Sequence, residues 1–205
     1  MQIPDEGRCP HCDCGGEVGH GCATELCQRK GYHYIPLESY QTLTANEHRN
    51  RNPSIGTVIG RYLLVSELGH GGFGTVYLAL QLPIKMKAAL KLVHRADSPE
   101  QAAERERRFL GEAQSLARLN HPNIVRMLQY DSIDDQPYLV MEYVPGRCSL
   151  DQEIARRRLA GTRFSTAEIE RIASQVAAAL DSAHGEGVIH RDLKPENLML
   201  QEVSG

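Results

Sequence analysis

The chain has 205 residues, of which 41% are hydrophobic and 24% are charged, and its 23 basic and 26 acidic residues give a formal net charge of −3. This length suits one domain together with a small module, and a near-neutral charge without a basic stripe argues against a nucleic-acid partner. No apolar run reaches membrane-spanning length and the N-terminus lacks the apolar core of a signal peptide, so we expect a soluble, cytoplasmic chain with no membrane segment.

The N-terminal segment is rich in cysteine, with five of the six cysteines lying between positions 9 and 27. A segment this short cannot bury a core of its own, so it is either disordered or held together by a cross-link or a metal. Cys9-x2-Cys12 and Cys22-x4-Cys27 form two ligand pairs, which in a reducing compartment favour a structural zinc with four cysteine ligands. Two further residues are spare candidates for the ligand set, namely Cys14 and His20.

A second interpretation of this segment comes from Cys9-Pro10-His11-Cys12, which matches the active-site tetrapeptide of a strongly oxidising thioredoxin-fold oxidoreductase. That chemistry needs the first cysteine at the N-terminus of a helix. The following Asp13-Cys14-Gly15-Gly16 does not propagate a helix, so zinc is the preferred reading, and disorder stays a third possibility. Residues 36–58 are polar and contain Asn-Arg-Asn-Pro at 50–53, which predicts a linker.

A glycine-rich stretch follows, with Gly69, Gly71 and Gly74 between the apolar runs 62–65 and 76–80. A strand, a glycine turn and a second strand let backbone amides approach phosphate oxygens without an intervening side chain. A dinucleotide-binding fold uses the same glycine spacing but continues into a helix. Here a strand follows, so the context disfavours a dinucleotide site.

Residues 87–93 form a short apolar strand that contains Lys91, and a helix is predicted to start at Ser98-Pro99-Glu100-Gln101 and to stop at 120–122. One face of this helix carries Phe109, Glu112, Ala113, Leu116 and Leu119. Glu112 therefore lies among apolar neighbours, where we expect it to point inward and to need a partner.

Strands are predicted at 124–130 and 137–144, on either side of an acidic turn, and the rest of the chain is helical. Residues 149–159 form a polar helix whose basic run, 156–158, reads as a solvated face. A capping box at 165–168 opens a longer helix that ends near Gly185. The apolar stripe of that helix comprises Ile169, Ile172, Ala173, Val176, Ala177, Leu180 and Ala183.

The helix leads to His190-Arg191-Asp192-Leu193-Lys194-Pro195-Glu196-Asn197. Phosphoryl transfer needs a carboxylate to orient the attacking hydroxyl, a cation beside the phosphoryl group and an amide oxygen for a metal, and Asp192, Lys194 and Asn197 supply these groups. With the glycine-rich stretch, Lys91, the helix with Glu112 and the segment 142–146, this octapeptide makes five motifs in the right order over residues 60–205. The chain thus resembles the bacterial eukaryotic-like (Hanks-type) serine/threonine protein kinases.

This resemblance implies an α+β, protein-kinase-like fold preceded by a small Cys-rich module. We expect a zinc-binding module at 1–35, a linker at 36–58, the kinase N-lobe and hinge at 59–144, and the start of a helical C-lobe at 145–205. It also implies phosphoryl transfer from Mg-ATP to a Ser or Thr of a protein substrate, since a Lys two positions after the Asp is the serine/threonine pattern.

The resemblance also assigns the ATP site. Lys91 would grip the α- and β-phosphates and pair with Glu112, and Asn197 would bind Mg²⁺. The other ATP-binding residues implied are Leu68, Gly69, His70, Gly71, Gly72, Phe73, Gly74, Val76, Ala89, Met141, Glu142, Val144 and Met199.

Kinases of this family carry an Asp-Phe-Gly element after the catalytic Asn, and none follows Asn197 here. We therefore expect a truncated kinase that is inactive as these 205 residues alone and whose in-frame continuation carries the missing element. The helical stripe would be left partly exposed, which predicts aggregation or a missing C-terminal portion or partner. The alternative is a non-catalytic ATP-binding or scaffold module, a kinase remnant with a zinc knuckle.

Overall fold

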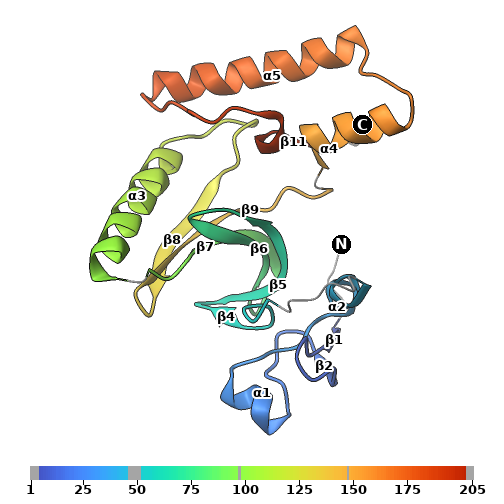
Figure 1. Ribbon diagram of the computed structural model, residues 1–205, viewed down its shortest axis with the longest axis vertical. Helices are drawn as coiled ribbons and strands as arrows, with labels where there is room; N and C mark the ends of the chain where they lie inside the picture. The colour runs from blue at the N-terminus through green and yellow to red at the C-terminus, as the bar shows by residue number, and fades with distance from the viewer. Residues whose placement is uncertain (1–4, 46–51, 97, 147, 202–205) are drawn as a thin grey trace. The chain divides into compact units, whose positions relative to one another are not determined.

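The computed structural model describes residues 5–45, 52–96, 98–146 and 148–201 (Figure 1). The chain divides into two compact units, Met1–Leu110 with Leu128–Tyr143, and Gly111–Met127 with Val144–Gly205. Within the described ranges, no helix combines the length and the apolar character that a membrane span requires.

A six-stranded sheet forms the main body of the first unit, with strand order β4-β5-β6-β7-β9-β8. The β4–β5, β5–β6, β6–β7 and β7–β9 pairs are antiparallel. The strands are β4 (Val58–Ile59), β5 (Tyr62–His70), β6 (Gly74–Gln81), β7 (Met86–Val93), β8 (Met127–Ile133) and β9 (Gln136–Glu142). The predicted strands at 62–65, 76–80 and 87–93 are confirmed, and β8 is shifted toward the C-terminus from the predicted 124–130.

The sheet is held by apolar side chains from its central strands, and Leu63, Leu64, Leu80, Leu90 and Val140 are almost completely buried. Strand β5 has irregular pairing with β6 at two places, between Leu64 and Ser66 and between Glu67 and Gly69. Such irregularities bend a strand. Here they occur where β5 approaches the glycine-rich turn.

Helix α3 (Pro99–Ala117) begins at the predicted proline, and the backbone amide of Gln101 donates to Ser98 Oγ at 3.3 Å. Phe109 and Ala113 are buried, as the helical stripe predicts. Glu112 is exposed, so the expectation that it points inward is wrong. A carboxylate at the edge of a narrow apolar stripe keeps its hydration, which burial would remove at a large cost.

The Cys-rich segment folds into a small three-stranded sheet of order β2-β1-β3. Its elements are β1 (Glu6–Arg8), β2 (Gly15–Glu17), α1 (Glu25–Arg29) and β3 (Ile35–Pro36). Helix α2 (Leu37–Ala45) follows directly and lies within the predicted linker. Val18, Ile35 and Ile55 are buried in the same cluster as Leu63 and Leu64 of β5. The segment thus packs part of its apolar residues into the core of the six-stranded sheet, and it has a second, small cluster of its own around Cys9, Cys22, Cys27, Tyr32 and Tyr34.

The second unit contains α4 (Leu150–Leu159), α5 (Thr166–Gly185), the short 3₁₀ helix η1 (Pro195–Asn197), and the paired strands β10 (Cys148–Ser149) and β11 (Met199–Leu200). Helix α5 opens with the predicted capping box: the Ser165 amide donates to Glu168 Oε2 at 2.8 Å, and the Glu168 amide donates to Ser165 Oγ at 3.3 Å. This reciprocal pair fixes the start of the helix.

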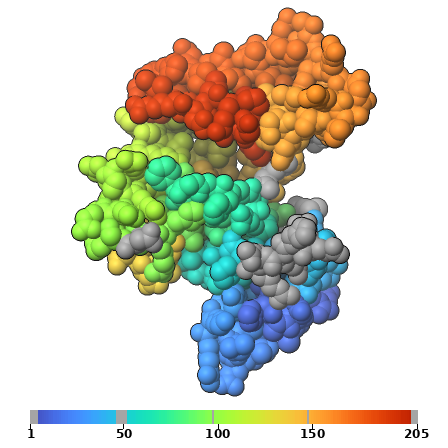
Figure 2. All heavy atoms as spheres, in the orientation of Figure 1, coloured from blue at the N-terminus to red at the C-terminus, as the bar shows by residue number. Residues whose placement is uncertain are grey.

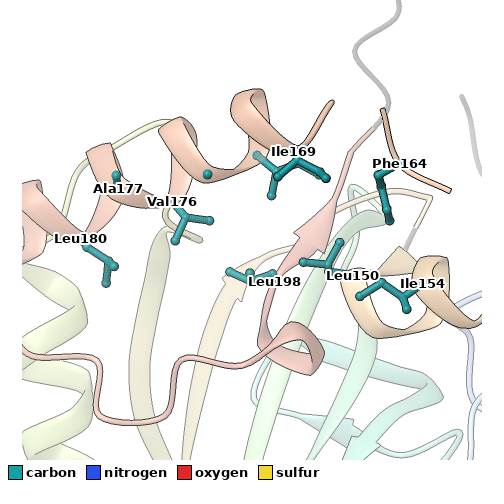
Figure 3. Close-up of a pocket in the computed structure, with 10 residues that line it drawn as sticks. Leu150, Ile154, Phe164, Ile169, Val176, Ala177, Leu180 and Leu198 are labelled. Carbon is teal, nitrogen blue, oxygen red and sulfur yellow. The ribbon is translucent and has the colours of Figure 1, made fainter. Parts of the chain in front are cut away.

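The apolar stripe of α5 borders an open groove of about 460 Å³ within the second unit. In Figure 3, Ile169, Val176 and Leu180 project from α5 toward Leu150 and Leu198. Ile169 is 56% exposed, which confirms that the stripe is only partly covered.

Arg157 links α4 to α5, so the prediction of a solvated basic face for 156–158 is wrong at this residue. Its Nε lies 2.7 Å from Glu153 Oε1 and its Nη2 lies 2.7 Å from Glu168 Oε1. The guanidinium carbon is 3.9 Å from the centroid of the Phe164 ring, a cation–π arrangement. Hydrogen bonds from Arg156 and Arg157 hold the pKa of Glu153 at about 2, and those from Arg157 and Ser165 hold the pKa of Glu168 at about 2.

Candidate active site

The glycine-rich turn joins β5 to β6, and the Gly71 amide donates to the Gly74 carbonyl at 3.0 Å. A side chain at Gly74 would place its Cβ 2.4 Å from the Leu92 carbonyl oxygen, so this position requires glycine. At Gly69 and Gly72 a Cβ would meet no atom within 4 Å. The turn therefore presents backbone in open space, as a phosphate-binding turn must.

A threonine and two histidines fasten this turn to the end of β7, and sequence reasoning missed two of the three. Thr75 Oγ1 is 2.9 Å from His70 Nδ1 and 3.0 Å from His94 Nε2. The two imidazole rings lie 4.8 Å apart, and the Thr75 side chain is buried. The His94 amide also donates to the Phe73 carbonyl at 3.1 Å. No motif marks Thr75 or His94, because their partnership depends on strand register.

The register of the sheet places four of the predicted ATP-site residues on one face. Val76 is opposite Lys91, and Ala89 is opposite Met141. Residues two apart on a strand share a face. Val76, Ala89, Lys91 and Met141 therefore form a mainly apolar surface with one cation.

Lys91 is half-buried on this face, and its Nζ lies 5.6 Å from the centroid of the buried Phe109 ring of α3. The ring face attracts the ammonium and helps to fix its position. The pairing of Lys91 with Glu112 stays a prediction. So do the roles of Leu68, Glu142, Val144 and Met199.

The catalytic-loop residues Asp192, Lys194 and Asn197 come together within the second unit. Lys194 Nζ lies 3.0 Å from Asp192 Oδ2. Asn197 Nδ2 donates to the Asp192 carbonyl at 2.8 Å and to its Oδ2 at 3.1 Å. Arg191 has a φ of 61°, a left-handed conformation that turns the chain just before Asp192.

This arrangement fixes the charge and orientation of the Asp192 carboxylate. Hydrogen bonds from Lys194 and Asn197, together with the charge of Lys194, hold the pKa of Asp192 below its usual range. The hydrogen bond and the charge of Asp192 in turn raise the pKa of Lys194. Because the Asn197 amide nitrogen is occupied by Asp192, its Oδ1 is the atom that can bind a metal. The loop thus offers an ionised carboxylate, a fixed ammonium and an amide oxygen within a few ångströms.

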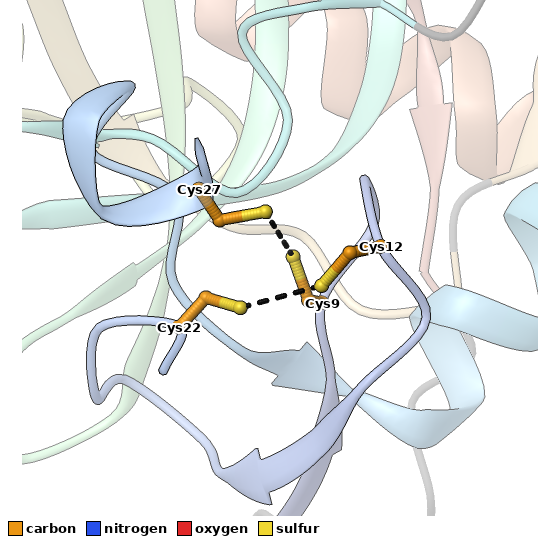
Figure 4. A group of neighbouring side chains, drawn as sticks. All are labelled: Cys9, Cys12, Cys22 and Cys27. Carbon is orange, nitrogen blue, oxygen red and sulfur yellow. Dashed lines mark hydrogen bonds between the residues drawn. The ribbon is translucent and has the colours of Figure 1, made fainter. Parts of the chain in front are cut away.

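A second group of chemically reactive side chains lies in the Cys-rich module. The sulfur atoms of Cys9, Cys12, Cys22 and Cys27 all lie within 4.8 Å of one another (Figure 4). Two of the distances are 3.8 Å, from Cys9 to Cys27, and 3.4 Å, from Cys12 to Cys22. Four thiolates bound tetrahedrally at about 2.3 Å from zinc would lie about 3.8 Å apart. The four sulfur atoms are therefore close enough together to be ligands of one metal ion.

The two spare candidates lie outside this group. Cys14 is exposed, with its sulfur 3.5 Å from Thr24 Oγ1, and His20 is exposed beside Glu17. All six cysteines fall in the described ranges and are free thiols. Burial raises the pKa of Cys9 and Cys27. At Cys12 burial acts in the same direction but is outweighed by hydrogen bonds, chiefly from Thr24 and the Cys14 backbone, which lower its pKa to about 6.

The structure contradicts the oxidoreductase interpretation of this segment. The Cys9 amide donates to the Cys14 carbonyl at 2.9 Å, and the Asp13 amide donates back to Cys9 at 3.1 Å. Asp13 has a φ of 64°, so a tight turn follows Cys9. A cysteine in such a turn lacks the helix N-terminus that lowers the pKa of an oxidoreductase thiol.

Comparison with known proteins agrees with these arrangements. The family described as the protein kinase domain matches residues 62–204. Serine/threonine-protein kinase Pkn1 of Myxococcus xanthus is 34% identical over 155 residues, which cover 76% of this chain and 21% of that protein. Serine/threonine-protein kinase PknJ of Mycobacterium tuberculosis is 36% identical over 152 residues, covering 74% of this chain and 24% of that protein. The chain therefore spans between a fifth and a quarter of the length of these relatives.

Among solved structures, the PknI kinase domain of Mycobacterium tuberculosis matches with a TM-score of 0.57 and 34% identity, over 71% of this chain and 57% of that one. The protein-kinase-like fold is thereby confirmed. The serine/threonine kinases among the relatives agree with the Asp192-x-Lys194 pattern. By its sequence, its fold and the make-up of its catalytic loop, the chain belongs to the protein kinase family.

Proposed function

We propose that this chain carries the nucleotide-binding and catalytic-loop portion of a serine/threonine protein kinase, which transfers a phosphoryl group from Mg-ATP to a Ser or Thr of a protein substrate. The observation that carries the proposal is the hydrogen-bonded set of Asp192, Lys194 and Asn197. A chance sequence on a surface turn would not be expected to bring these three side chains together.

In this proposal the backbone amides of Gly69–Gly74 contact the phosphates, and Lys91 binds the α- and β-phosphate oxygens. The apolar face formed by Val76, Ala89 and Met141 covers the adenine ring, and the backbone of Glu142 and Val144 faces the adenine edge. Leu68 and Met199 complete the apolar lining.

Asp192 accepts and orients the hydroxyl of the substrate, which brings its oxygen toward the γ-phosphorus. Lys194 stabilises the charge on the transferring group and, as long as it stays paired, keeps Asp192 ionised. Asn197 Oδ1 would hold a magnesium ion, whose charge neutralises that developing on the phosphate oxygens. Each of these roles uses a side chain that the contacts within the loop hold in place.

Radiolabel transfer to a generic Ser/Thr substrate tests this proposal. The sequence contains no Asp-Phe-Gly element, so we expect transfer only when one is supplied, for example by fusion to the C-terminal part of the PknI kinase domain. Asp192→Asn should then abolish most of the activity, whereas Asp181→Asn, on the exposed surface of α5, should not. Transfer that survives Asp192→Asn would overturn the proposed role.

The exposed stripe of α5 supports a second candidate, a non-catalytic ATP-binding or scaffold module that uses this face to bind a partner. The two candidates differ in one measurement. A scaffold would show no Asp192-dependent transfer in the fusion described above, although it would still bind Mg-ATP.

We also propose that Cys9, Cys12, Cys22 and Cys27 hold one structural zinc ion. The sulfur separations support this, and so does the burial of three of the four residues. Thiolate ligands of this kind persist in a reducing compartment, which supports a cytoplasmic location. Elemental analysis of the reduced protein should find about one zinc per chain.

The double variant Cys9→Ser with Cys22→Ser should lose that zinc, while Cys14→Ser should keep it because Cys14 is exposed and outside the group. Zinc content that is unchanged in the double variant would refute the ligand set.

A further inference from the structure

We infer that metal binding at the four cysteines stabilises the six-stranded sheet itself, including the hairpin that carries the glycine-rich turn. This inference rests on the proposed zinc site and adds a consequence for the kinase fold. The structural basis is the packing of residues 5–45 against strands β4–β7, all within the first unit. Residues 5–45 comprise the Cys-rich segment and α2 and are here called the module.

The two parts share one hydrophobic core. Ile35 of β3 and Val18 are 0% and 1% exposed, and they belong to the same cluster as Leu63 and Leu64 of β5, which are both 0% exposed. In Figure 2 the blue module lies directly against the cyan part of the sheet. Because a segment of this size cannot bury enough apolar surface alone, its fold depends on that of β5. Leu63 and Leu64 of β5 are in turn buried in a cluster to which the module contributes Val18 and Ile35.

A continuous run of backbone hydrogen bonds leads from the metal ligands to β5. The Cys22 amide donates to the Tyr32 carbonyl at 2.8 Å, and the Tyr32 amide donates to the Cys27 carbonyl at 3.0 Å. The next residue, His33, donates its amide to the Gly56 carbonyl at 2.7 Å. The Gly56 amide in turn donates to the Leu64 carbonyl at 2.8 Å. Cys22 and Cys27 are thus connected through one short stretch of backbone to Leu64, near the start of β5.

Gly56 also packs closely against the cysteine turn. Its φ is +88°, and a Cβ there would lie 2.6 Å from Cγ of Pro10, the residue after ligand Cys9. A second close approach is Gly19, where a Cβ would lie 2.8 Å from Cδ2 of Leu82, which follows β6. An ion pair of 2.6 Å between Lys85 Nζ and Asp5 Oδ1 adds a third connection.

Metal binding contributes directly to folding because the unfolded chain rarely has a preformed site for the metal. A ligand that binds only the folded state stabilises everything that unfolds with its site. Since the core and the hydrogen bonds run through the module into β5, we expect β5 to gain stability when the four cysteines bind zinc. By reciprocity, weakening the interface weakens zinc binding.

Hydrogen exchange of the full chain, followed by mass spectrometry, tests the inference. Zinc-loaded protein is compared with the same protein after removal of zinc by a chelator under reducing conditions. Exchange in peptides from β5 and β6 (62–81) should rise about tenfold or more on zinc removal, together with exchange in residues 5–45. Peptides from α5 (166–185), in the second unit, serve as the internal reference and should change little.

Two glycine variants test the connection between the four cysteines and β5 without changing a metal ligand. Gly56→Ala and Gly31→Ala both place alanine at a positive φ, +88° and +71°. Only Gly56→Ala pushes a Cβ into Pro10, because the space at Gly31 is open. In zinc-loaded protein, Gly56→Ala should raise hydrogen exchange in β5 and should speed the loss of zinc to a chelator, each by about tenfold. Both effects should be several times smaller in Gly31→Ala.

The outcomes separate the two proposals. A reduced protein that binds no zinc would overturn both the metal site and the coupling. A protein that binds zinc, but whose exchange in 62–81 is the same with and without the metal, would overturn the coupling alone. Equal effects of Gly56→Ala and Gly31→Ala would show that the interface at Pro10 does not carry the coupling.

Discussion

The side-chain nitrogen of Lys194 lies 3.0 Å from Oδ2 of Asp192, so the cation and the carboxylate of the catalytic loop form an ion pair with each other. Asn197 donates to the same carboxylate oxygen at 3.1 Å. An ionised carboxylate that is held from one side can present its other oxygen to a hydroxyl. The pair therefore prepares the loop before any substrate arrives.

Replacing Lys194 with Met removes the positive charge that lowers the pKa of Asp192. The pKa of Asp192 should then rise toward its ordinary value of 3.8. Carboxyl-carbon NMR titration of labelled protein measures this change directly. Lys87→Met, at an exposed position of β7 in the first unit, should leave the titration of Asp192 unchanged. An unchanged titration in Lys194→Met would show that the ion pair does not form.

Replacing Thr75 with Val removes the hydroxyl shared by His70 and His94 while keeping the shape of the side chain. Because that hydroxyl is buried, its loss should cost about 1–3 kcal/mol in the free energy of unfolding. The turn should also become more mobile, and Mg-ATP should bind less tightly. Denaturant unfolding and nucleotide titration measure the two effects, and Thr162→Val, at an exposed site, is the control. Identical behaviour of the two variants would contradict a role for Thr75 in holding the turn.

We expect the ion pairs of Glu153 and Glu168 to stabilise the folded chain in a way that acid removes. Their folded-state pKa of about 2 lies below the ordinary value of 4.5. Their ion pairs therefore stabilise the folded chain fully above pH 4.5, and this contribution is lost as the pH falls from about 4.5 through 2.

The test compares the unfolding free energy of wild type and Glu153→Gln across this range. The difference between them should be largest near neutral pH and should shrink toward pH 2, with Glu170→Gln, on the exposed surface of α5, as the control. A difference that does not vary with pH would mean that Glu153 acts through packing rather than charge.

Ile169 lies on the partly covered apolar stripe of α5, and we expect this stripe to make the chain self-associate. Since this side chain is 56% exposed, Ile169→Gln should change the free energy of unfolding by less than about 0.5 kcal/mol. It should nevertheless reduce aggregation, because it interrupts an exposed apolar surface. Light scattering against concentration measures the effect, and Ser174→Gln, on the polar side of α5, should have none. Equal aggregation of wild type and both variants would exclude the stripe as the cause.

Much of this fold was predictable because its signals are local. The glycine turn between two strands, the start of α3 at Ser98-Pro99 and the capping box of α5 each depend on residues a few positions apart. The grouping of Cys9, Cys12, Cys22 and Cys27 in space was predictable as well, since the spacing of the two pairs already limits the geometry. The order of the kinase motifs along the chain predicted the protein-kinase-like fold.

The residues that sequence reasoning missed or misplaced all depend on tertiary packing. Arg157 looked solvated because its partner Glu168 lies on the next helix. Glu112 looked inward-facing because helical periodicity marks a stripe but not how wide a stripe is buried. The connection from Thr75 to His94 and the core shared by Ile35 with β5 require the strand pairing to be known.

Titration of the 205-residue chain with Mg-ATP in a calorimeter shows whether this chain forms the ATP site of a protein kinase. We predict measurable binding that Lys91→Met weakens about tenfold or more, as expected for loss of a charged hydrogen bond to phosphate. Lys30→Met, at an exposed position after α1 and outside the proposed ATP site, should bind like wild type. Absence of binding in wild type, or equal binding by Lys91→Met and Lys30→Met, would show that these residues do not form an ATP site.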